Sequence, residues 1–347
     1  QNKIVKESKI KHFNDMNKKI RWGILGAGRI AQKFASDLKL VDDTELFAIA
    51  SRGKANTEVF AGLYPSALQY HSYEALVQNP DVDVIYIATP HGLHYEHAML
   101  CLQHSKAVLC EKAFALNAQQ AKEMIAAANA HRVFLMEALW SKFTPQWQKM
   151  MEIIRDGQLG EIKNVLINFG FIPQAPVADR LYNPALGGGT LLDIGVYNVF
   201  YALSALGKPD HIEASMTPAD TGVDEQCAVL FRYNNGAIAQ LFSSYSTHLA
   251  TEADISGNKG RIRLTHRFYT PDTTIEFYPG RADSKTIIPV LRGEGFGYHY
   301  EARHVGECLR QGLTESPVMT HADTLLLMET MDEIRRKAGI RYDADDV

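Results

Sequence analysis

The chain has 347 residues, 46% hydrophobic and 22% charged, which is ordinary for a globular protein and long enough for two domains with sizeable cores. Its net charge of -4 argues against a nucleic-acid partner and gives no sign of attraction to an anionic membrane. No apolar run reaches membrane-spanning length, and the lysine-rich residues 1–18 lack the apolar core of a signal peptide. We therefore expect a solvated extension over 1–18, with Met16 as an alternative start.

The cysteines give an expectation about the compartment. Cys101, Cys110, Cys227 and Cys308 are widely spaced and form no Cys-x-x-Cys pair. This spacing favours buried, reduced thiols over disulfides or a zinc site, and hence a cytoplasmic protein.

The first strand and helix carry a glycine pattern typical of a dinucleotide-binding turn. An apolar strand runs into Gly-x-Gly-x-x-Ala just where an amphipathic helix is predicted to begin. Gly26 allows the turn, Gly28 lets the backbone approach a pyrophosphate, and Ala31 permits close packing of the helix on the strand. The phosphates would lie on the N–H groups of the first helical turn, beside Arg29 and Ile30. The pattern alone also fits a plain structural turn.

The end of the second strand, predicted over 44–50, bears on the choice of cofactor. An NAD-specific site places a carboxylate there for the ribose 2′-hydroxyl, whereas this chain has Ser51 and Arg52. A guanidinium is a planar, permanently charged donor that suits a 2′-phosphate. We therefore expect NADP(H), with NAD(H) the second choice; an ordinary solvated Arg52 is the alternative interpretation.

Strands and helices alternate up to about residue 140, which predicts a parallel sheet with helices on both faces and a Rossmann domain over residues 19–141. Ligands of such sheets bind at the carboxyl ends of the strands, here Thr89-Pro90-His91, Glu111-Lys112 and the segment 137–142. The further strands are expected at 68–70, 82–88, 107–110 and 133–138, and the helices at 31–38, 55–63, 72–78, 95–104 and 118–130.

Beyond residue 141 strand-like runs follow one another without intervening helices, which predicts a second α/β domain over 142–347 with a largely antiparallel sheet. The strands are expected at 162–171, 211–216, 228–233, 237–244, 250–255 and 261–265, and the helices at 145–155, 190–206, 298–311 and 322–338.

A second group of chemically active residues lies in this domain. Three glycines at 187–189 would let the backbone approach a ligand, and Asp193 and Tyr197, four apart on a helix, project from the same face. Together with Lys112 they supply ionisable groups suited to proton transfer, because a nearby ammonium lowers the pKa of a phenol. An amphipathic helix with one Asp and one Tyr is also a common structural feature.

Several segments in order resemble the glucose-fructose oxidoreductase/inositol dehydrogenase/MocA family, from about Lys19 onward. Within that family the chain is most similar to the dimeric dihydrodiol dehydrogenases. The resemblance implies a Rossmann domain followed by an open-faced sheet domain, NADP(H), and a sugar or a cyclic vicinal diol as substrate. The matching segments are the glycine turn, Ala88-Thr89-Pro90-His91-x-x-His94, Glu111-Lys112, 136–143 and 187–197.

The resemblance also assigns roles to residues. It makes Lys112 the catalytic lysine and maps the Asp and Tyr of the dihydrodiol branch onto Asp193 and Tyr197. It places the segment Thr89, Pro90, His91 and His94 along the nicotinamide pocket, and Glu111, Trp140 and Lys142 beside the cofactor. Arg180 and Tyr298 are candidate substrate contacts, with an ordinary surface salt bridge as the alternative for Arg180.

Two local features qualify these assignments. Ala113 stands where the family usually has proline, and because a non-proline cis peptide costs roughly 2.5–4 kcal/mol, a trans Lys112–Ala113 peptide is expected. His91, His94 and His97 have a spacing that can converge on a metal, but no carboxylate or cysteine completes a site, so no metal is expected.

The sequence thus predicts a cytoplasmic NADP(H)-dependent oxidoreductase with Tyr197 as acid/base, assisted by Lys112 and Asp193. A nucleotide-sensing protein without turnover is the alternative, and a metal-dependent hydrolase comes third. We also expect a homodimer formed through the second sheet, because its strands around 165–169, 227–231 and 238–242 carry more apolar groups than a one-sided sheet can hide.

Overall fold

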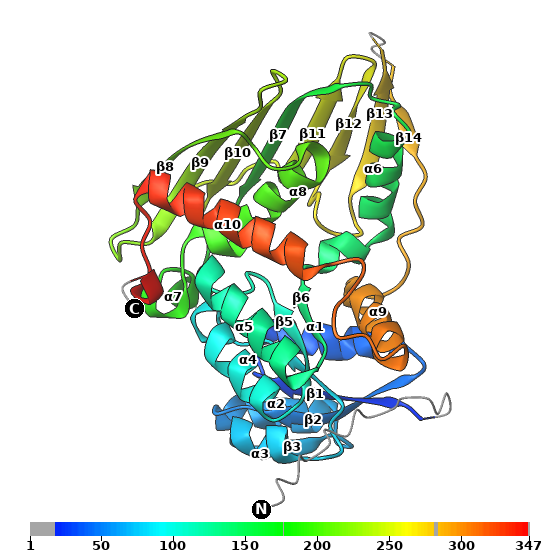
Figure 1. The fold of residues 1–347 in the computed structure, drawn as a ribbon, viewed down its shortest axis with the longest axis vertical. Coiled ribbons are helices and arrows are strands. Elements are labelled where there is room, and N and C mark those ends of the chain that lie inside the picture. The colour runs from blue at the N-terminus through cyan, green and yellow to red at the C-terminus, as the bar shows by residue number, and fades with distance from the viewer. Residues whose placement is uncertain (1–17, 176, 281–283, 346–347) are drawn as a thin grey trace, which may run out of the picture.

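The computed structural model describes residues 18–175, 177–280 and 284–345 (Figure 1). Residues 1–17 of the predicted N-terminal extension lie outside the described part of the chain, and the last residue of the extension, Lys18, lies inside it.

Sheet A is a six-stranded, fully parallel sheet in the order β3-β2-β1-β4-β5-β6. Its order reverses between β1 and β4, so the ends of these two strands lie side by side at the point where such sheets bind ligands. The strands are β1 (Ile20–Leu25), β2 (Thr44–Ala50), β3 (Leu68–Tyr70), β4 (Val84–Ile87), β5 (Ala107–Glu111) and β6 (Leu135–Ala138).

Helices cover both faces of sheet A because successive strand residues point to opposite sides. Trp22 and Ile24 of β1 join the core under α1, whereas Leu25 joins a second core under α3, α4 and α5. All four cysteines are free and buried, which confirms the expectation of buried thiols. The helices of this part are α1 (Arg29–Leu38), α2 (Lys54–Leu63), α3 (Tyr73–Gln78), α4 (His94–Gln103) and α5 (Ala118–His131), with short 3-10 turns η1 (His91–Leu93) and η2 (Trp140–Phe143).

Sheet B has eight strands in the order β14-β13-β12-β11-β7-β10-β9-β8, and all neighbours except β7 and β10 are antiparallel. Its mainly antiparallel character is as predicted. The strands are β7 (Ile162–Gly170), β8 (His211–Pro218), β9 (Asp224–Arg232), β10 (Ile238–Ser244), β11 (Glu252–Gly257), β12 (Gly260–Thr265), β13 (Thr274–Pro279) and β14 (Thr286–Ile288).

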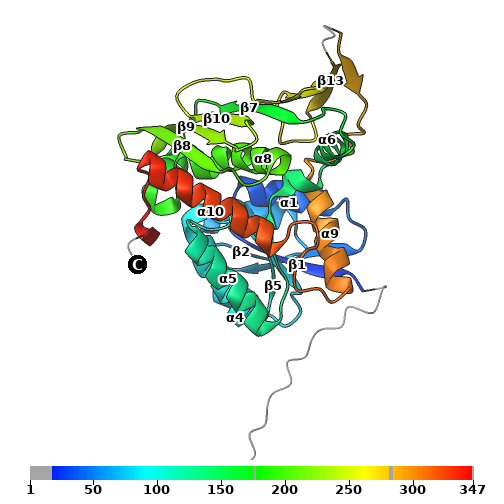
Figure 2. The same ribbon diagram turned by 45° about the horizontal axis from the view of Figure 1, so that its top comes forward.

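Helices α6 (Pro145–Arg155), α8 (Val196–Leu206) and α10 (His321–Ala338) lie on one side of sheet B, and its other side is open (Figure 2). Strands β13 and β14 and helix α7 were not predicted; β14 forms an edge of the sheet and is only 3 residues long. The remaining elements are α7 (Val177–Leu181) and α9 (Tyr298–Arg310), the 3-10 turns η3 (Pro184–Leu186) and η5 (Asp343–Asp345), and the π-helical turn η4 (Leu191–Gly195).

Helix α9 follows sheet B in the chain but packs on α1 beside sheet A. Its first residue follows Gly297, which has no side chain to cap the helix. Asp37 of α1 supplies the cap, because its buried carboxylate accepts the backbone N–H groups of Phe296, Gly297 and Tyr298 at 2.7–2.9 Å. This contact ties the start of α9 to the helix of the glycine turn.

One stretch departs from the expectation that no apolar run is long enough to span a membrane. Residues Pro184–Leu206 pass that test by length and composition, but 72% of the apolar window is buried inside the protein. It therefore has the character of a core helix.

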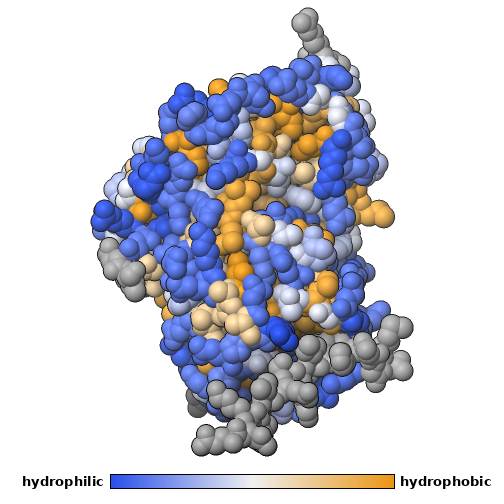
Figure 3. All heavy atoms as spheres, in the orientation of Figure 1, coloured by the Kyte–Doolittle hydropathy of each residue, from blue (hydrophilic) through white to orange (hydrophobic). Residues whose placement is uncertain are grey.

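On the face shown in Figure 3, hydrophilic side chains separate the exposed hydrophobic atoms, which gather mainly in the upper half where sheet B lies.

Candidate active site

The glycine turn after β1 has the shape of a phosphate cradle. Gly26 has φ +99, and a Cβ there would lie 2.9 Å from the Ala88 carbonyl oxygen, so only glycine fits. A Cβ on Gly28 would meet nothing within 4 Å, which leaves open space beside the backbone. Helix α1 has no side-chain cap and no acidic residue in its first turn. Its N–H groups are therefore available to an anion, as the residues of a pyrophosphate site must be.

Positive charge gathers next to this turn. Burial lowers the pKa of Lys33, and the nearby guanidinium groups of Arg29 and Arg267 lower it further. Arg267 belongs to the second domain, in the turn after β12. Neither arginine forms an ion pair within the described part of the chain, so both guanidinium groups are available to an anion.

The end of β2 carries no acid. Ser51 is buried and accepts a hydrogen bond from the Gly53 N–H at 3.2 Å, which shapes the turn. Arg52 is exposed, and its guanidinium lies 5.6 Å from the ring centroid of Tyr73. Among the described residues it has no ion-pair partner, so it is free to meet an anionic group at the edge of the dinucleotide site.

His94 holds two loops together at the ends of β4 and β5. Its Nε2 lies 2.7 Å from the Thr89 carbonyl oxygen and its Nδ1 lies 2.8 Å from the Ala113 carbonyl oxygen. Because burial lowers its pKa to about 4, the neutral ring has one N–H and donates to one of these oxygens at a time. The side chain is fully buried, so His94 acts through the two loops that it joins.

The Lys112–Ala113 peptide is cis, so the prediction of a trans bond was wrong. The prediction considered only the local preference of a non-proline peptide and not the neighbours that hold this segment. The Glu111 carboxylate accepts the Lys112 N–H at 3.2 Å, and the Ala113 carbonyl faces His94. These contacts lie on both sides of the Lys112–Ala113 peptide.

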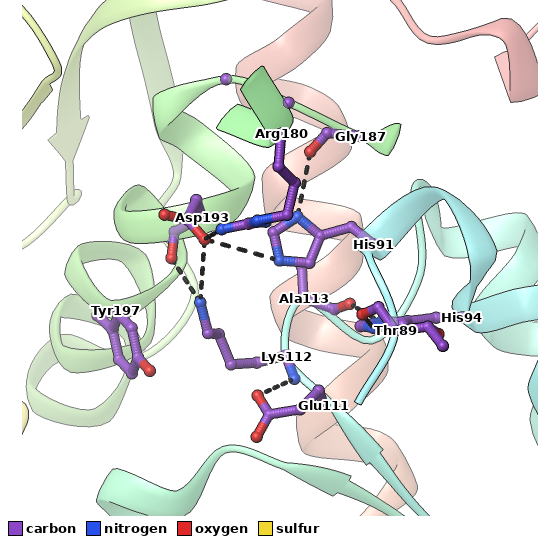
Figure 4. Close-up of polar contacts among 12 residues, drawn as sticks. Thr89, His91, His94, Glu111, Lys112, Ala113, Arg180, Gly187, Asp193 and Tyr197 are labelled. Atoms are coloured by element: carbon purple, nitrogen blue, oxygen red, sulfur yellow. Dashed lines mark hydrogen bonds and ion pairs between the residues drawn. The ribbon is translucent and has the colours of Figure 1, made fainter. Parts of the chain in front are cut away.

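Asp193 is the centre of a polar cluster that joins the two domains (Figure 4). Lys112 Nζ donates to the Asp193 carbonyl oxygen at 2.6 Å and lies 3.7 Å from Oδ1. Arg180 donates to Oδ1 at 3.2 Å, and the Tyr245 hydroxyl donates to Oδ2 at 3.0 Å. Burial alone would raise the pKa of Asp193, but Lys112, Arg180, His91 and the Tyr245 hydroxyl hold it well below its ordinary value. The carboxylate is therefore charged at neutral pH.

Asp193 lies in the π-helical turn η4, and a buried aspartate fixes the start of that turn. Asp224 of β9 accepts hydrogen bonds from the Thr190 hydroxyl at 2.8 Å and from the Leu191 N–H at 2.7 Å. A Cβ on Gly189 would lie 2.1 Å from Asp224 Oδ1, so the glycine run is needed for this approach. Burial raises the pKa of Asp224 to about 6.

Tyr197 lies one turn after Asp193, at the start of α8, with its hydroxyl near the same space. The indole Nε1 of Trp140 donates to this hydroxyl at 2.8 Å, whereas Lys112 Nζ lies 5.0 Å from the ring centroid, over the ring. Burial, with Tyr298, Glu111 and Tyr269 nearby, raises the pKa of Tyr197 well above its ordinary value. The prediction that Lys112 lowers this pKa is therefore wrong for this state of the protein, in which Tyr197 is a neutral phenol.

Glu111 is a second titratable group under the site. It is buried, accepts a hydrogen bond from the Tyr86 hydroxyl, and lies below Lys112 in Figure 4. Burial raises its pKa to about 7, and the Lys112 ammonium opposes this rise. The chain thus places a carboxyl group that titrates near neutral pH beside Lys112.

The other predicted site residues divide between this site and structural roles. His91 joins it, with Nδ1 3.1 Å from the Gly187 carbonyl oxygen, and burial and Lys112 lower its pKa to about 3. Tyr298 packs on Trp140 with ring centroids 4.7 Å apart. Lys142 is held in an ion pair with Asp323 of α10 at 2.8 Å.

No metal centre is formed within residues 18–175, 177–280 and 284–345, where no group of three or more His, Cys, Asp or Glu side chains is arranged to hold an ion. His97 forms a hydrogen bond through Nδ1 with the Thr89 hydroxyl at 3.0 Å.

Sequence reasoning missed Tyr245, Asp224 and the contact between Trp140 and Tyr197. Tyr245 follows β10 and Asp224 begins β9, and neither residue stands at a spacing that marks a site. Only the pairing of these strands in sheet B brings them to η4.

Comparisons with known proteins agree with this geometry. The family model described as oxidoreductase family, NAD-binding Rossmann fold, matches residues 20–139, and that of the GFO/IDH/MocA C-terminal domain matches residues 147–263. Trans-1,2-dihydrobenzene-1,2-diol dehydrogenase of Mus musculus is 36% identical over 337 residues, which cover 94% of this chain and 99% of the relative. The same enzyme of Homo sapiens is 34% identical over 338 residues, with the same coverage of 94% and 99%.

A solved structure shows the same architecture. The 3-ketoreductase from Actinomadura kijaniata in complex with NADP and TDP-benzene superimposes with a TM-score of 0.83 and 26% identity, covering 92% of this chain and 98% of that one. The chain therefore belongs to the GFO/IDH/MocA family of oxidoreductases, with an N-terminal Rossmann domain that binds a nicotinamide dinucleotide.

Proposed function

We propose that this protein is an NADP(H)-dependent oxidoreductase that interconverts a hydroxyl and a carbonyl group on a sugar or a cyclic vicinal diol. The similar proteins are a dehydrogenase of a dihydrobenzene diol and a ketoreductase crystallised with NADP, which supports this substrate range. The cofactor, when bound, supplies or accepts the hydride at nicotinamide C4. The absence of an acid at the end of β2, together with exposed Arg52, supports NADP(H) over NAD(H).

The observation that carries the proposal is the convergence of Lys112 from sheet A with Asp193 and Tyr197 from the second domain (Figure 4). An ammonium has three N–H donors, and among the described residues Lys112 gives one of them to the Asp193 carbonyl oxygen, so N–H donors remain available to a substrate oxygen. Lys112 and Asp193 keep 13% and 14% of their side chains exposed, which leaves them within reach of a small molecule.

Tyr197 is suited to move the proton. The Trp140 indole is a donor only, so it leaves the hydroxyl proton of Tyr197 free, and no described residue accepts that proton. In reduction the phenol would donate to the substrate oxygen, and in oxidation the phenolate would accept the proton back. Asp193 holds Lys112 in place, because its carbonyl oxygen accepts a hydrogen bond from the ammonium and its carboxylate forms an ion pair with it.

The test compares Tyr197→Phe with Tyr201→Phe. Tyr201 is a buried tyrosine one turn later in α8, and its hydroxyl donates to the Phe268 carbonyl oxygen outside the site. Tyr197→Phe and Lys112→Met should each lower kcat by about 10²–10⁴-fold with NADP binding nearly unchanged, because a positioned acid/base contributes about that factor. Tyr201→Phe should stay close to the parent. Full turnover by Tyr197→Phe, with chemistry rate-limiting, would show that another group holds the proton.

We also propose a homodimer through the open face of sheet B. Leu166, Leu230, Ile238 and Phe242 point to this face from adjacent central strands, and Leu166 and Ile238 are 40% and 37% exposed. The apolar groups between them in sequence, such as Ile167, point instead to the helices. The exposed set is bordered by ion pairs Arg261–Asp254, Arg263–Glu252 and Arg232–Glu213 on the same face. A small apolar centre with a charged rim is typical of a protein interface.

A further inference from the structure

Among the described residues the hydroxyl of Tyr197 has one hydrogen-bond partner, the indole of Trp140. Trp140 Nε1 donates to the Tyr197 oxygen at 2.8 Å, and both side chains are buried, with exposed fractions of 4% and 5%. Because the indole can only donate, the phenol oxygen accepts this bond and keeps its own proton. A phenolate at Tyr197 would accept the same hydrogen bond from the indole.

Lys112 does not fill this role. Its ammonium lies over the face of the Tyr197 ring and is bonded to Asp193. Burial raises the pKa of Tyr197, and the hydrogen bond from Trp140 acts in the opposite direction and lowers it. At the phenol oxygen itself, the indole is the donor that the fold provides.

The surroundings of Trp140 fix the direction of its N–H. The ring is packed between Tyr298 and the edge of Tyr269, with ring centroids 4.7 Å and 6.1 Å away. Gly297 has φ +110, and a Cβ on it would lie 3.1 Å from Trp140 Cζ3, so the glycine leaves room for the indole. Tyr298 is itself placed by the Asp37 cap. The donor is thus held in position before any charge forms on Tyr197.

We propose that Trp140 is a positioning residue for proton transfer, whose N–H stabilises the phenolate form of Tyr197. The proposal rests on the function proposed above. In reduction, hydride reaches the substrate carbon, the O–H bond of Tyr197 breaks, and its proton goes to the substrate oxygen; the phenolate later takes a proton from water. In oxidation the phenolate accepts the substrate hydroxyl proton. The Trp140 bond is stronger to the phenolate than to the phenol, so it favours the charged state.

The first experiment is a pH profile of kcat/KM for Trp140→Phe, which keeps an aromatic ring and removes the donor. The limb of the profile that reports the ionisation of Tyr197 should move to higher pH by about 1 to 2 units. The free energy of a hydrogen bond to a charged group corresponds to a pKa shift of about that size. At a fixed pH below the limb, oxidation should slow about 10- to 100-fold. Trp147→Phe is the matched control, because Trp147 is equally buried but its Nε1 has no hydrogen-bond partner among the described residues.

A second readout does not depend on turnover. The chain has 3 tryptophans, so a ¹⁵N-labelled protein gives few indole N–H signals, and Trp140→Phe identifies the one from Trp140. Tyr197→Phe should move that signal to the position of a weaker hydrogen bond and leave the other indole signals unchanged. An unmoved Trp140 signal would show that the bond is absent in solution and would overturn the proposal.

The outcomes separate the two proposals. If Tyr197→Phe is inactive and Trp140→Phe loses activity equally at every pH, or no more than Trp147→Phe, then Trp140 only packs the site and this inference is wrong. If Tyr197→Phe keeps full turnover and its pH limb, the acid/base role of Tyr197 fails, whatever Trp140 does. A raised limb in Trp140→Phe, absent from Trp147→Phe, supports both.

Discussion

Replacing Asp37 with asparagine should weaken the attachment of α9 to the first domain. The Asp37 side chain is 1% exposed, and its carboxylate accepts three backbone N–H groups at the start of α9. Asparagine keeps one oxygen, but it removes the negative charge and turns an N–H₂ group toward donors. The variant therefore tests whether a residue of α1 is the cap of a helix that follows sheet B.

The size of the effect follows from the contacts. A hydrogen bond to a charged group is worth about 1.5–3 kcal/mol and a neutral one about 1 kcal/mol, and a carboxylate at a partly buried helix N-terminus adds up to about 2 kcal/mol. Losing the charge and at least one bond should therefore lower the free energy of unfolding by about 2 to 4 kcal/mol. Each kcal/mol corresponds to about 2–4 °C in Tm for chains of this order of length.

The assay is urea unfolding followed by circular dichroism, with Asp42→Asn as the control. Asp42 is an exposed aspartate just after α1 with no partner among the described residues. Burial would raise the pKa of Asp37, but His299 and the N–H groups of α9 lower it below its ordinary value. Its contribution should therefore be complete above an unfolded pKa of about 3.9 and be lost as the pH falls through the lower folded pKa. Equal urea midpoints for the two variants at neutral pH would refute the cap.

Two further predictions concern the cofactor and the assembly. Arg52→Ala should weaken NADP binding by about 10- to 100-fold and NAD binding far less, because only NADP offers a 2′-phosphate for a charge-assisted contact of about 1.5–3 kcal/mol. The dissociation constants are measured by fluorescence titration. Equal values for the two cofactors in the parent would contradict the proposed preference. Light scattering should give twice the 38.7 kDa mass of the chain for the parent and the mass of one chain for Leu166→Glu. Leu63→Glu is the control and should stay a dimer, because Leu63 is 54% exposed on α2, away from sheet B. A stable, active monomer of the parent would rule out the interface.

The sequence was sufficient for features whose cause is local. The alternation of strands and helices and the Gly26–Gly28 turn depend on periodicity and on backbone conformations that glycine allows, and both are found where predicted. The edge strand β14 was missed because it is short and Ile287 on it is 50% exposed, so the strand has no alternating pattern of burial to detect.

The site depended on contacts that no local pattern encodes. Lys112, Asp193 and Tyr197 were candidates because of their residue types, their spacing and the family resemblance, but their partners were not predicted. Tyr245 reaches Asp193 only because β10 lies between β7 and β9, and Trp140 reaches Tyr197 only through the meeting of the two domains. The pKa of Tyr197 could not be inferred from the proximity of Lys112 either, because its direction is decided by burial.

The charges of the cluster have a consequence for the reaction. Asp193 stays ionised although it is buried, and two cations, Lys112 and Arg180, lie against this one carboxylate. His91 is neutral at pH 7, since its pKa is about 3, so it adds no further positive charge. Asp193, Lys112 and Arg180 together therefore carry a formal charge of +1, while Glu111 beside Lys112 is a carboxyl group with a pKa of about 7. An alkoxide is the charge that builds up on a substrate oxygen during hydride transfer, and a fixed positive charge in a site shielded from water stabilises it more than water would. We therefore propose two effects of the carboxylate: it holds Lys112 in place, and it leaves the charge of the two cations only partly compensated, which would favour the state in which the substrate oxygen is negative.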